Sequence, residues 1–107
     1  MTTESADMMA RLEAIVATRA DASPNDSHTA RLLAKGRAKV AEKLGEEALE
    51  TVIAAVQDDR DAVVAESADL LFHLAVLWKD VGITVADVDA ELARREGRSG
   101  LQEKASR

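Results

Sequence analysis

Two long apolar segments joined by a very short polar connection constrain this fold more than any other feature. Residues 37–56 and 60–81 both carry hydrophobic side chains at helical spacing, and Gln57, Asp58 and Asp59 separate them. Helices joined by so few residues are normally antiparallel neighbours. The sequence therefore predicts a helical hairpin with a tight turn at 58–60.

The second helix of this hairpin has no clean solvent face. Its apolar residues lie all around the helix: Val63, Val64, Leu70, Leu71, Phe72, Leu74, Ala75, Val76, Leu77 and Trp78. Such a helix is expected to be buried by its neighbours. A chain of 107 residues buries only about two thirds of its unfolded surface when it folds alone. We therefore expect a second copy to complete the helical core, which predicts a homodimer.

Two pairs of carboxylates face each other across the predicted hairpin. Glu47 precedes Glu50 by three residues, a spacing that places both on one surface of the first helix. Glu66 and Asp69 repeat this spacing on the second helix. Four carboxylates at close range repel one another, so we expect a cation between them. Because the chain has no cysteine and carboxylate oxygens suit hard divalent cations, the predicted ion is Mg²⁺.

The acidic residues also have a simpler interpretation. Glu46, Glu47 and Glu50 could form an ordinary solvated helix face, which is the usual role of a run of charges. Glu66 and Asp69 favour a metal site instead, because they interrupt a helix that has no spare face for solvent. The sequence contains no Glu-x-x-His motif, which argues against a di-iron bundle.

His73 shares a polar stripe with Glu66 and Asp69 on the second helix. A histidine on an apolar helix is more often a core residue with satisfied hydrogen bonds than a metal ligand. We expect its ring to orient Asp69, or a glutamate of the preceding helix, through a hydrogen bond. The prediction places His73 behind the metal ligands rather than among them.

Basic residues beside the acids are candidates for binding phosphate. Lys39 and Lys43 lie four residues apart next to the acidic strip, and Arg31 lies on a short helix before them. Ordinary surface positions would explain these residues equally well. A net charge of -6, with one Phe and one Trp, argues against a nucleic-acid binder that neutralises phosphates or stacks bases. A polyanionic ligand would therefore need the metal as an intermediary.

The remaining segments complete an all-α bundle of four to five helices. Periodicity predicts helices at 3–20 and 28–33, and a further helix through Arg95 that begins after a capping box at 84–87. We expect one domain at 1–97, followed by a polar tail at 98–107. The longest apolar run is too short to span a membrane, and the N-terminus does not resemble a secretion signal. A cytoplasmic protein is the expectation.

Several of these motifs resemble a known family. Residues 47–50 (Glu-Ala-Leu-Glu) and 66–69 (Glu-Ser-Ala-Asp) resemble the E-x-x-E and E-x-x-D signature of the all-α nucleoside triphosphate pyrophosphohydrolase superfamily. Residues 39–50 and 68–74 are similar to the phosphoribosyl-ATP pyrophosphohydrolase family in particular. Residues 27–32 resemble that family's Ser-Tyr-Thr-x-x-Leu segment. The chain departs from the family pattern at His28 and Phe72, where Tyr is usual or frequent, so phenol contacts are absent there.

The resemblance implies Mg²⁺-dependent hydrolysis of 1-(5-phosphoribosyl)-ATP to 1-(5-phosphoribosyl)-AMP and pyrophosphate, the second step of histidine biosynthesis. It implies a small-molecule nucleotide as substrate, with the metal on the two acidic pairs. Glu46 would orient or deprotonate the attacking water. Arg98 and Lys104 are weaker phosphate candidates than the basic residues named above.

Two other functions are compatible with the same residues. One is a house-cleaning pyrophosphatase of the same superfamily that acts on dUTP or non-standard triphosphates. The other is a non-catalytic dimeric helical bundle whose acids are solvated or bind a structural cation.

Overall fold

The computed structural model describes residues 3–96 and Lys104, with side chains from residue 8 onward. Five helices make up this part of the chain, and it contains no strand: α1 (Thr3–Ala20), α2 (His28–Ala34), α3 (Arg37–Val56), α4 (Arg60–Val81) and α5 (Val85–Arg95). The all-α prediction is confirmed, and the helix boundaries agree with the expected ones to within about two residues. The tail from residue 98, including Arg98, lies outside the described residues except for Lys104, whose side chain is exposed.

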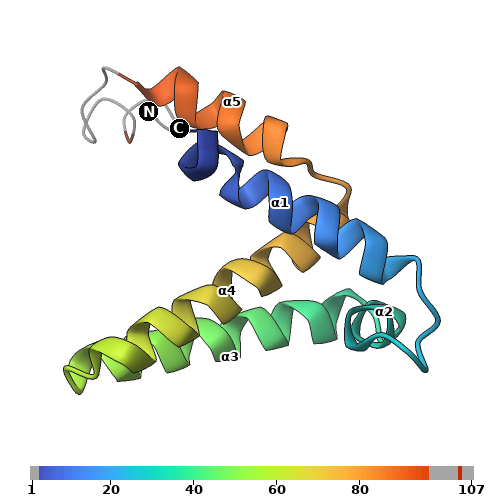
Figure 1. The fold of residues 1–107 in the computed structure, drawn as a ribbon, viewed down its shortest axis with the longest axis horizontal. Coiled ribbons are helices and arrows are strands. Elements are labelled where there is room, and N and C mark those ends of the chain that lie inside the picture. Colours follow the sequence, from blue (N-terminus) through green and yellow to red (C-terminus); the bar gives the residue numbers. More distant parts are fainter. Residues whose placement is uncertain (1–2, 97–103, 105–107) are drawn as a thin grey trace.

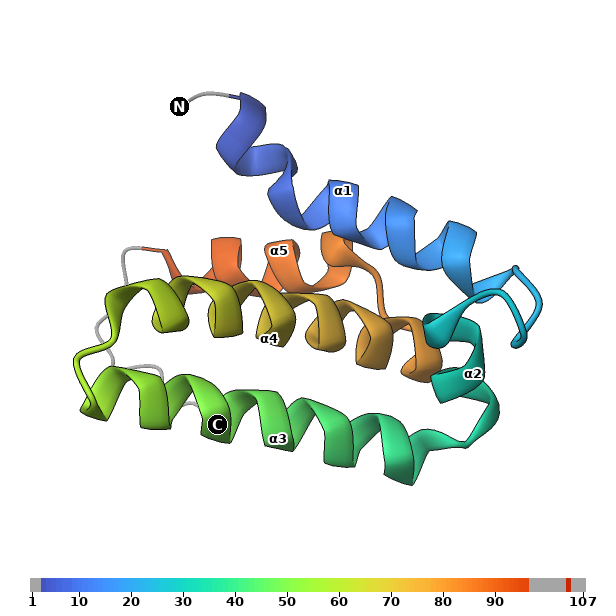
Figure 2. The same cartoon turned by 60° about the horizontal axis from the view of Figure 1, so that its bottom comes forward.

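Helices α3 and α4 form the predicted antiparallel hairpin and lie side by side along their whole length (Figure 2). Asp58 occupies the left-handed region in the turn, with φ 57°, a conformation that Asp tolerates better than most residues. The Asp59 side chain caps α4 by accepting a hydrogen bond of 3.1 Å from the Ala62 amide. Local capping chemistry thus ends one helix and begins the next within three residues.

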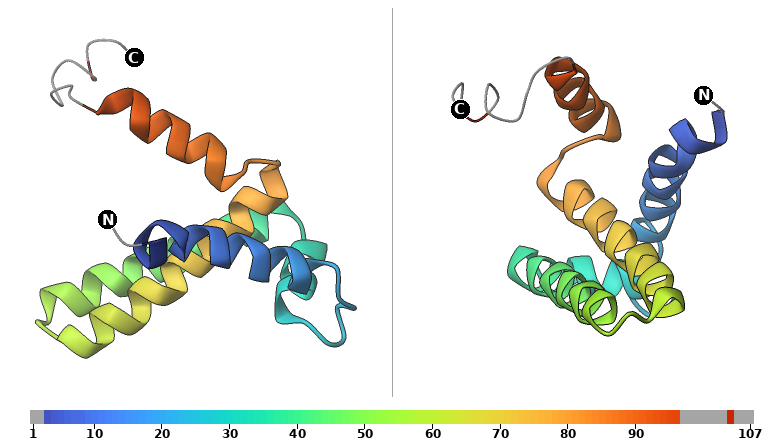
Figure 3. Two further views of the ribbon diagram at one scale, coloured as in Figure 1. Left: turned by 45° about the horizontal axis from the view of Figure 1, so that its top comes forward. Right: turned by 90° about the vertical axis from the view of Figure 1, so that its left-hand side faces the viewer.

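Helices α1 and α2 pack against the hairpin near the end opposite its turn. Helix α1 crosses α4, and α2 lies beside the beginning of α3 (Figure 1). Helix α5 buries no residue and projects away from the hairpin (Figure 3). Its first turn is attached to α1, because the Glu13 carboxylate accepts a hydrogen bond of 2.7 Å from the Val85 amide.

The core of a single copy is small. It consists of five residues from α1, α2, α3 and α4: Val16, Leu32, Val40, Ala75 and Val76. Many large apolar side chains remain exposed: Met8, Ile15, Leu49, Val52, Ile53, Val56, Val64, Ile83 and Leu92. Helix α4 is therefore not covered on all sides within one chain. A Cβ atom added at Gly45 would also meet open space, so no helix of this copy makes the close approach that a mid-helix glycine suggests.

Within the described residues, every helix is too short or too polar to cross a lipid bilayer.

Candidate metal and phosphate site

Glu47 lies on the inner face of α3. The buried residues of this helix are Val40, Glu47 and Ala54, and their spacing of seven residues is close to two helical turns. Glu47 therefore occupies a position where the helix otherwise carries apolar side chains, and it is only 7% exposed. A carboxylate is rarely buried in this way without a partner cation.

Glu66, Asp69 and His73 project from one side of α4 because they are three and four residues apart. The hairpin brings the acids of α4 against the inner face of α3. One carboxylate oxygen from each of Glu47, Glu66 and Asp69 lies within 4.8 Å of the other two. Glu47 is buried, Glu66 is half-buried and Asp69 is exposed, so the group opens from the helix interface towards solvent.

Glu50 joins this group through Glu66. The pKa of Glu66 is raised above its ordinary value of 4.5, first by a hydrogen bond with the Glu50 side chain, then by burial, and then by the charges of Glu50, Glu47 and Asp69. The four predicted carboxylates are therefore neighbours in space. We refer to Glu47, Glu50, Glu66 and Asp69 as the acid cluster.

The acid cluster fits a small, hard divalent cation. One oxygen of Glu47 and one of Glu66 are fully buried, and neither has a hydrogen-bond partner in the described part of the chain. Unsatisfied buried oxygens are costly, and bound Mg²⁺ would satisfy them.

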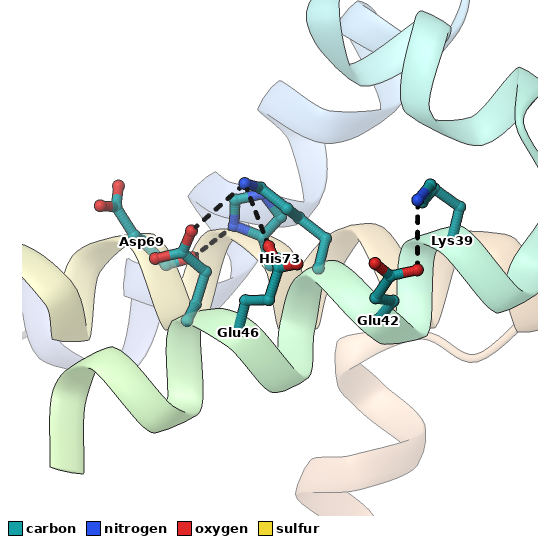
Figure 4. Close-up of polar contacts among 7 residues, drawn as sticks. Lys39, Glu42, Glu46, Asp69 and His73 are labelled. Carbon is teal, nitrogen blue, oxygen red and sulfur yellow. Dashed lines mark hydrogen bonds and ion pairs between the residues drawn. The ribbon is translucent and has the colours of Figure 1, made fainter. Parts of the chain in front are cut away.

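His73 is buried, and its ring bonds to Asp69, one of the two predicted partners, but through the main chain. Its Nδ1 atom lies 2.8 Å from the main-chain oxygen of Asp69, one helical turn earlier. Figure 4 shows the Asp69 carboxylate pointing away from the ring. His73 therefore contacts the backbone beneath a candidate ligand rather than its carboxylate. The Nε2 atom is buried without a hydrogen-bond partner among the described residues.

Lys43 connects the acid cluster with the neighbouring surface of α3. Its Nζ atom lies 3.9 Å from a Glu47 oxygen and 3.5 Å from a Glu46 oxygen. Figure 4 shows the Glu46 side chain projecting from α3. Although Glu46 and Glu47 are adjacent in sequence, the Glu46 side chain is half exposed and lies outside the group of three carboxylates. Glu46 is thus at the edge of the site, where solvent has access.

A groove lined by basic residues lies beside Glu46. It has a volume of about 220 Å³, and its polar lining residues are His28, Lys35, Lys39, Glu42, Lys43 and Glu46. We call it the basic groove. The structure brings the predicted phosphate ligands Lys39 and Lys43 together here, and it adds Lys35, which the sequence interpretation did not include. The spacing of four residues between successive lysines was a signal that could have identified it.

Arg31 does not line the basic groove. Its guanidinium instead donates a hydrogen bond of 3.1 Å from Nε to the main-chain oxygen of Pro24, in the loop before α2. The role of Arg31 in phosphate binding stays a prediction.

Known proteins with similar sequences point to one family. Residues 9–96 match the family model described as phosphoribosyl-ATP pyrophosphohydrolase. The chain is 62% identical over 96 residues to a phosphoribosyl-ATP pyrophosphatase of Sinorhizobium medicae, covering 90% of each chain. It is 59% identical over 97 residues to the protein of that name from Rhizorhabdus wittichii, covering 91% of this chain and 92% of the relative. The relative from Paramagnetospirillum magneticum is 52% identical over 100 residues, covering 94% and 92%. The matched region contains all of α2 to α5 and the whole acid cluster, and the chain therefore belongs to the phosphoribosyl-ATP pyrophosphohydrolase family.

Proposed function

We propose that this chain hydrolyses 1-(5-phosphoribosyl)-ATP to 1-(5-phosphoribosyl)-AMP and pyrophosphate, using Mg²⁺ held by the acid cluster. The proposal rests on a group of carboxylate oxygens within 4.8 Å of one another in a member of this family. Two of these side chains, Glu47 and Glu66, each have a buried oxygen with no hydrogen-bond partner among the described residues. As the second step of histidine biosynthesis, the reaction is expected to take place in the cytoplasm.

Charge explains why a metal is needed. The protein carries a net charge of -6, and a triphosphate is itself strongly anionic, so direct binding at four carboxylates would be repulsive. Mg²⁺ bound at the acid cluster would neutralise both partners and stabilise the charge that develops on the leaving pyrophosphate. The side chains of Glu47, Glu50, Glu66 and Asp69 hold the ion in this proposal.

Residues at the rim of the acid cluster have separate tasks. Glu46 is half exposed beside the cluster, where it can accept a proton from the attacking water. Lys43 lies between Glu46 and Glu47, so its ammonium group can move from these acids to a phosphate oxygen when the substrate enters. His73 supports the main chain of Asp69 and thereby fixes the position of that ligand. The reaction needs no nucleophilic side chain, because water attacks the phosphorus.

A substrate panel tests the proposed activity. Purified protein is assayed for pyrophosphate release from phosphoribosyl-ATP, ATP, dUTP and a set of ordinary deoxynucleoside triphosphates, with Mg²⁺ and after chelation. We expect release from phosphoribosyl-ATP that stops on chelation and returns when Mg²⁺ is restored. Preferential hydrolysis of dUTP or of another ordinary triphosphate would favour the house-cleaning alternative. No hydrolysis of any nucleotide would favour the non-catalytic bundle.

The proposal includes a homodimer. The exposed residues Leu49, Val52, Ile53 and Val56 of α3 and Val64 of α4 lie in the half of the hairpin nearest its turn. An apolar patch of this kind commonly marks an interface, and its burial by a second copy would add to a small core. Analytical ultracentrifugation at micromolar concentration is expected to give twice the monomer mass. A stable, active monomer would contradict this part of the proposal.

A further inference from the structure

We propose that the basic groove binds the second phosphate of the substrate, the 5-phosphate of its phosphoribosyl group, and that Lys35 is the main determinant of this contact. The inference rests on the proposed function and deepens it. In phosphoribosyl-ATP, two riboses and an adenine separate this phosphate from the triphosphate. A site that recognises the second phosphate would distinguish the substrate from ordinary nucleoside triphosphates, which lack it.

The lysines that line the groove outnumber its acids by one, and Lys35 is the lysine without an acidic partner among the described residues. Lys39 forms an ion pair of 3.2 Å with Glu42, and Lys43 forms one of 3.5 Å with Glu46. Each acid of the groove therefore already has a lysine partner. The ammonium group of Lys35 has neither an ion pair nor a hydrogen bond to any residue that the structure describes. It is the cation of the groove that can bind an anion without breaking an existing contact.

His28 adds a hydrogen-bond donor to the same groove. Its side chain is exposed on the first turn of α2, and its ring makes no hydrogen bond within the described residues. An imidazole N–H can donate to a phosphate oxygen even when the ring is neutral. Lys35, at the end of α2, and Lys39, on the first turn of α3, line the same groove. Gly36, with φ 100°, makes the turn between these helices.

The groove is small and adjoins the acid cluster. Its volume of about 220 Å³ is below the roughly 300 to 1,000 Å³ typical of whole-ligand pockets, so it suits part of a nucleotide. Lys39 precedes Glu47 by eight residues, which is about 12 Å along a helix. Lys43 and Glu46 line the groove and adjoin the acid cluster. One extended ligand can therefore reach both sites.

The first experiment measures binding of ribose 5-phosphate without Mg²⁺, by nuclear magnetic resonance titration of the full chain. We expect chemical-shift changes centred on Lys35, His28 and Lys39, and none with ribose. Lys35→Met should weaken binding about tenfold, since a hydrogen bond to a charged group typically contributes this much. Lys79→Met, a matched control on α4 that lines a different cavity, should bind as the unaltered chain does. Absence of binding, a requirement for Mg²⁺, or equal binding by Lys35→Met would overturn the proposal.

The second experiment compares phosphoribosyl-ATP with 1-ribosyl-ATP, the same molecule without the 5-phosphate. Lys35→Met should lower kcat/KM about tenfold more for phosphoribosyl-ATP than for 1-ribosyl-ATP, mainly through a higher KM. An equal loss for both compounds would overturn the assignment, because Lys35 would then act elsewhere on the substrate. If the unaltered protein hydrolyses neither compound, the proposed function fails, and the ribose 5-phosphate titration still decides whether the groove binds phosphate.

Discussion

Glu66 on α4 and Glu91 on α5 carry the same carboxylate group, but their neighbours have opposite charge. Glu66 is half-buried among Glu47, Glu50 and Asp69, and these acids and its burial raise its pKa. Glu91 is exposed and lies 2.6 Å from Arg94 and 3.1 Å from Arg95. These two guanidinium groups lower its pKa to about 2. The pKa values of the two carboxyl groups are therefore shifted in opposite directions, first by side-chain hydrogen bonds, with Glu50 for Glu66 and with Arg94 and Arg95 for Glu91, and then by the charges of these neighbours.

The comparison distinguishes a carboxylate whose charge is balanced by neighbouring cations, Glu91, from one that is surrounded by other acids, Glu66. The charge of Glu91 is balanced by arginines of its own helix, so Glu91 is an ordinary residue of a solvated helix face. In the acid cluster, Glu47 and Glu66 each keep a buried oxygen without a hydrogen-bond partner in the described part of the chain. Such an arrangement costs stability in the metal-free protein. A bound cation, as proposed above, would supply the positive charge that the acid cluster lacks.

The largest effect is expected from removing a ligand charge in the acid cluster. Glu50→Gln or Asp69→Asn should abolish Mg²⁺-dependent pyrophosphate release, with a loss beyond the roughly 100-fold typical of residues that only support metal ligands. The helical circular dichroism spectrum should not change, because neither residue belongs to the core. Near-normal turnover of either variant would remove the acid cluster from the mechanism.

Binding of Mg²⁺ itself provides the control for these variants. At a concentration about 100 times its dissociation constant, a ligand that binds only the folded chain stabilises it by about 2.7 kcal/mol. We expect thermal unfolding at fixed protein concentration to show this stabilisation for the unaltered chain and to lose it for Asp69→Asn. Equal stabilisation of both proteins would place the metal elsewhere.

Glu66→Gln is expected to have an intermediate effect on stability, and to stabilise the metal-free protein rather than destabilise it. Because its folded-state pKa is raised above 4.5, its stabilising contribution is fully present below pH 4.5 and is lost as the pH rises through the folded-state pKa. Glu66→Gln should therefore raise the Tm of the metal-free protein at pH 7 and reduce the fall in Tm above pH 4.5. The same variant should lose the stabilisation by Mg²⁺. A lower Tm for metal-free Glu66→Gln at pH 7 would mean that the acids do not repel one another.

Part of the fold and of the candidate site could be predicted from the sequence, because it depends on local signals. Helical periodicity, the Asp59 cap and the capping box at Thr84 are local signals, so the five helices and the hairpin followed from them. The burial of Glu47 on the inner face with Val40 and Ala54 is a finding of the structure, because the sequence interpretation placed Glu47 only among the charged residues of α3. Residues three apart on two facing helices were expected to lie near one another, and Glu47, Glu66 and Asp69 do so.

Other features depend on side-chain directions that spacing does not determine. His73 bonds to a main-chain oxygen on its own helix rather than to a carboxylate, and Arg31 turns back to Pro24. Lys35 joins Lys39 in the basic groove across the turn at Gly36. The partner of Glu46 is Lys43 on the same helix. Helical spacing indicates which of these residues are neighbours, but the rotamers and the turn decide which atoms they contact.

The smallest effect is expected from Glu91→Gln, which alters the carboxylate whose charge is balanced by neighbouring arginines. The folded-state pKa of Glu91 is about 2, below the ordinary value of 4.5, so its contribution to stability is present above pH 4.5 and is lost as the pH falls towards 2. Exposed ion pairs contribute little, and Glu91→Gln should therefore lower the Tm only slightly at pH 7. This difference from the unaltered chain should shrink as the pH falls below 4.5, the opposite of the trend at Glu66.

Pyrophosphate release by Glu91→Gln should be unchanged, because α5 contributes no residue to the acid cluster. A raised Tm at pH 7 would show that Glu91, like Glu66, is held in a repulsive environment, and the distinction between the two sites would then disappear.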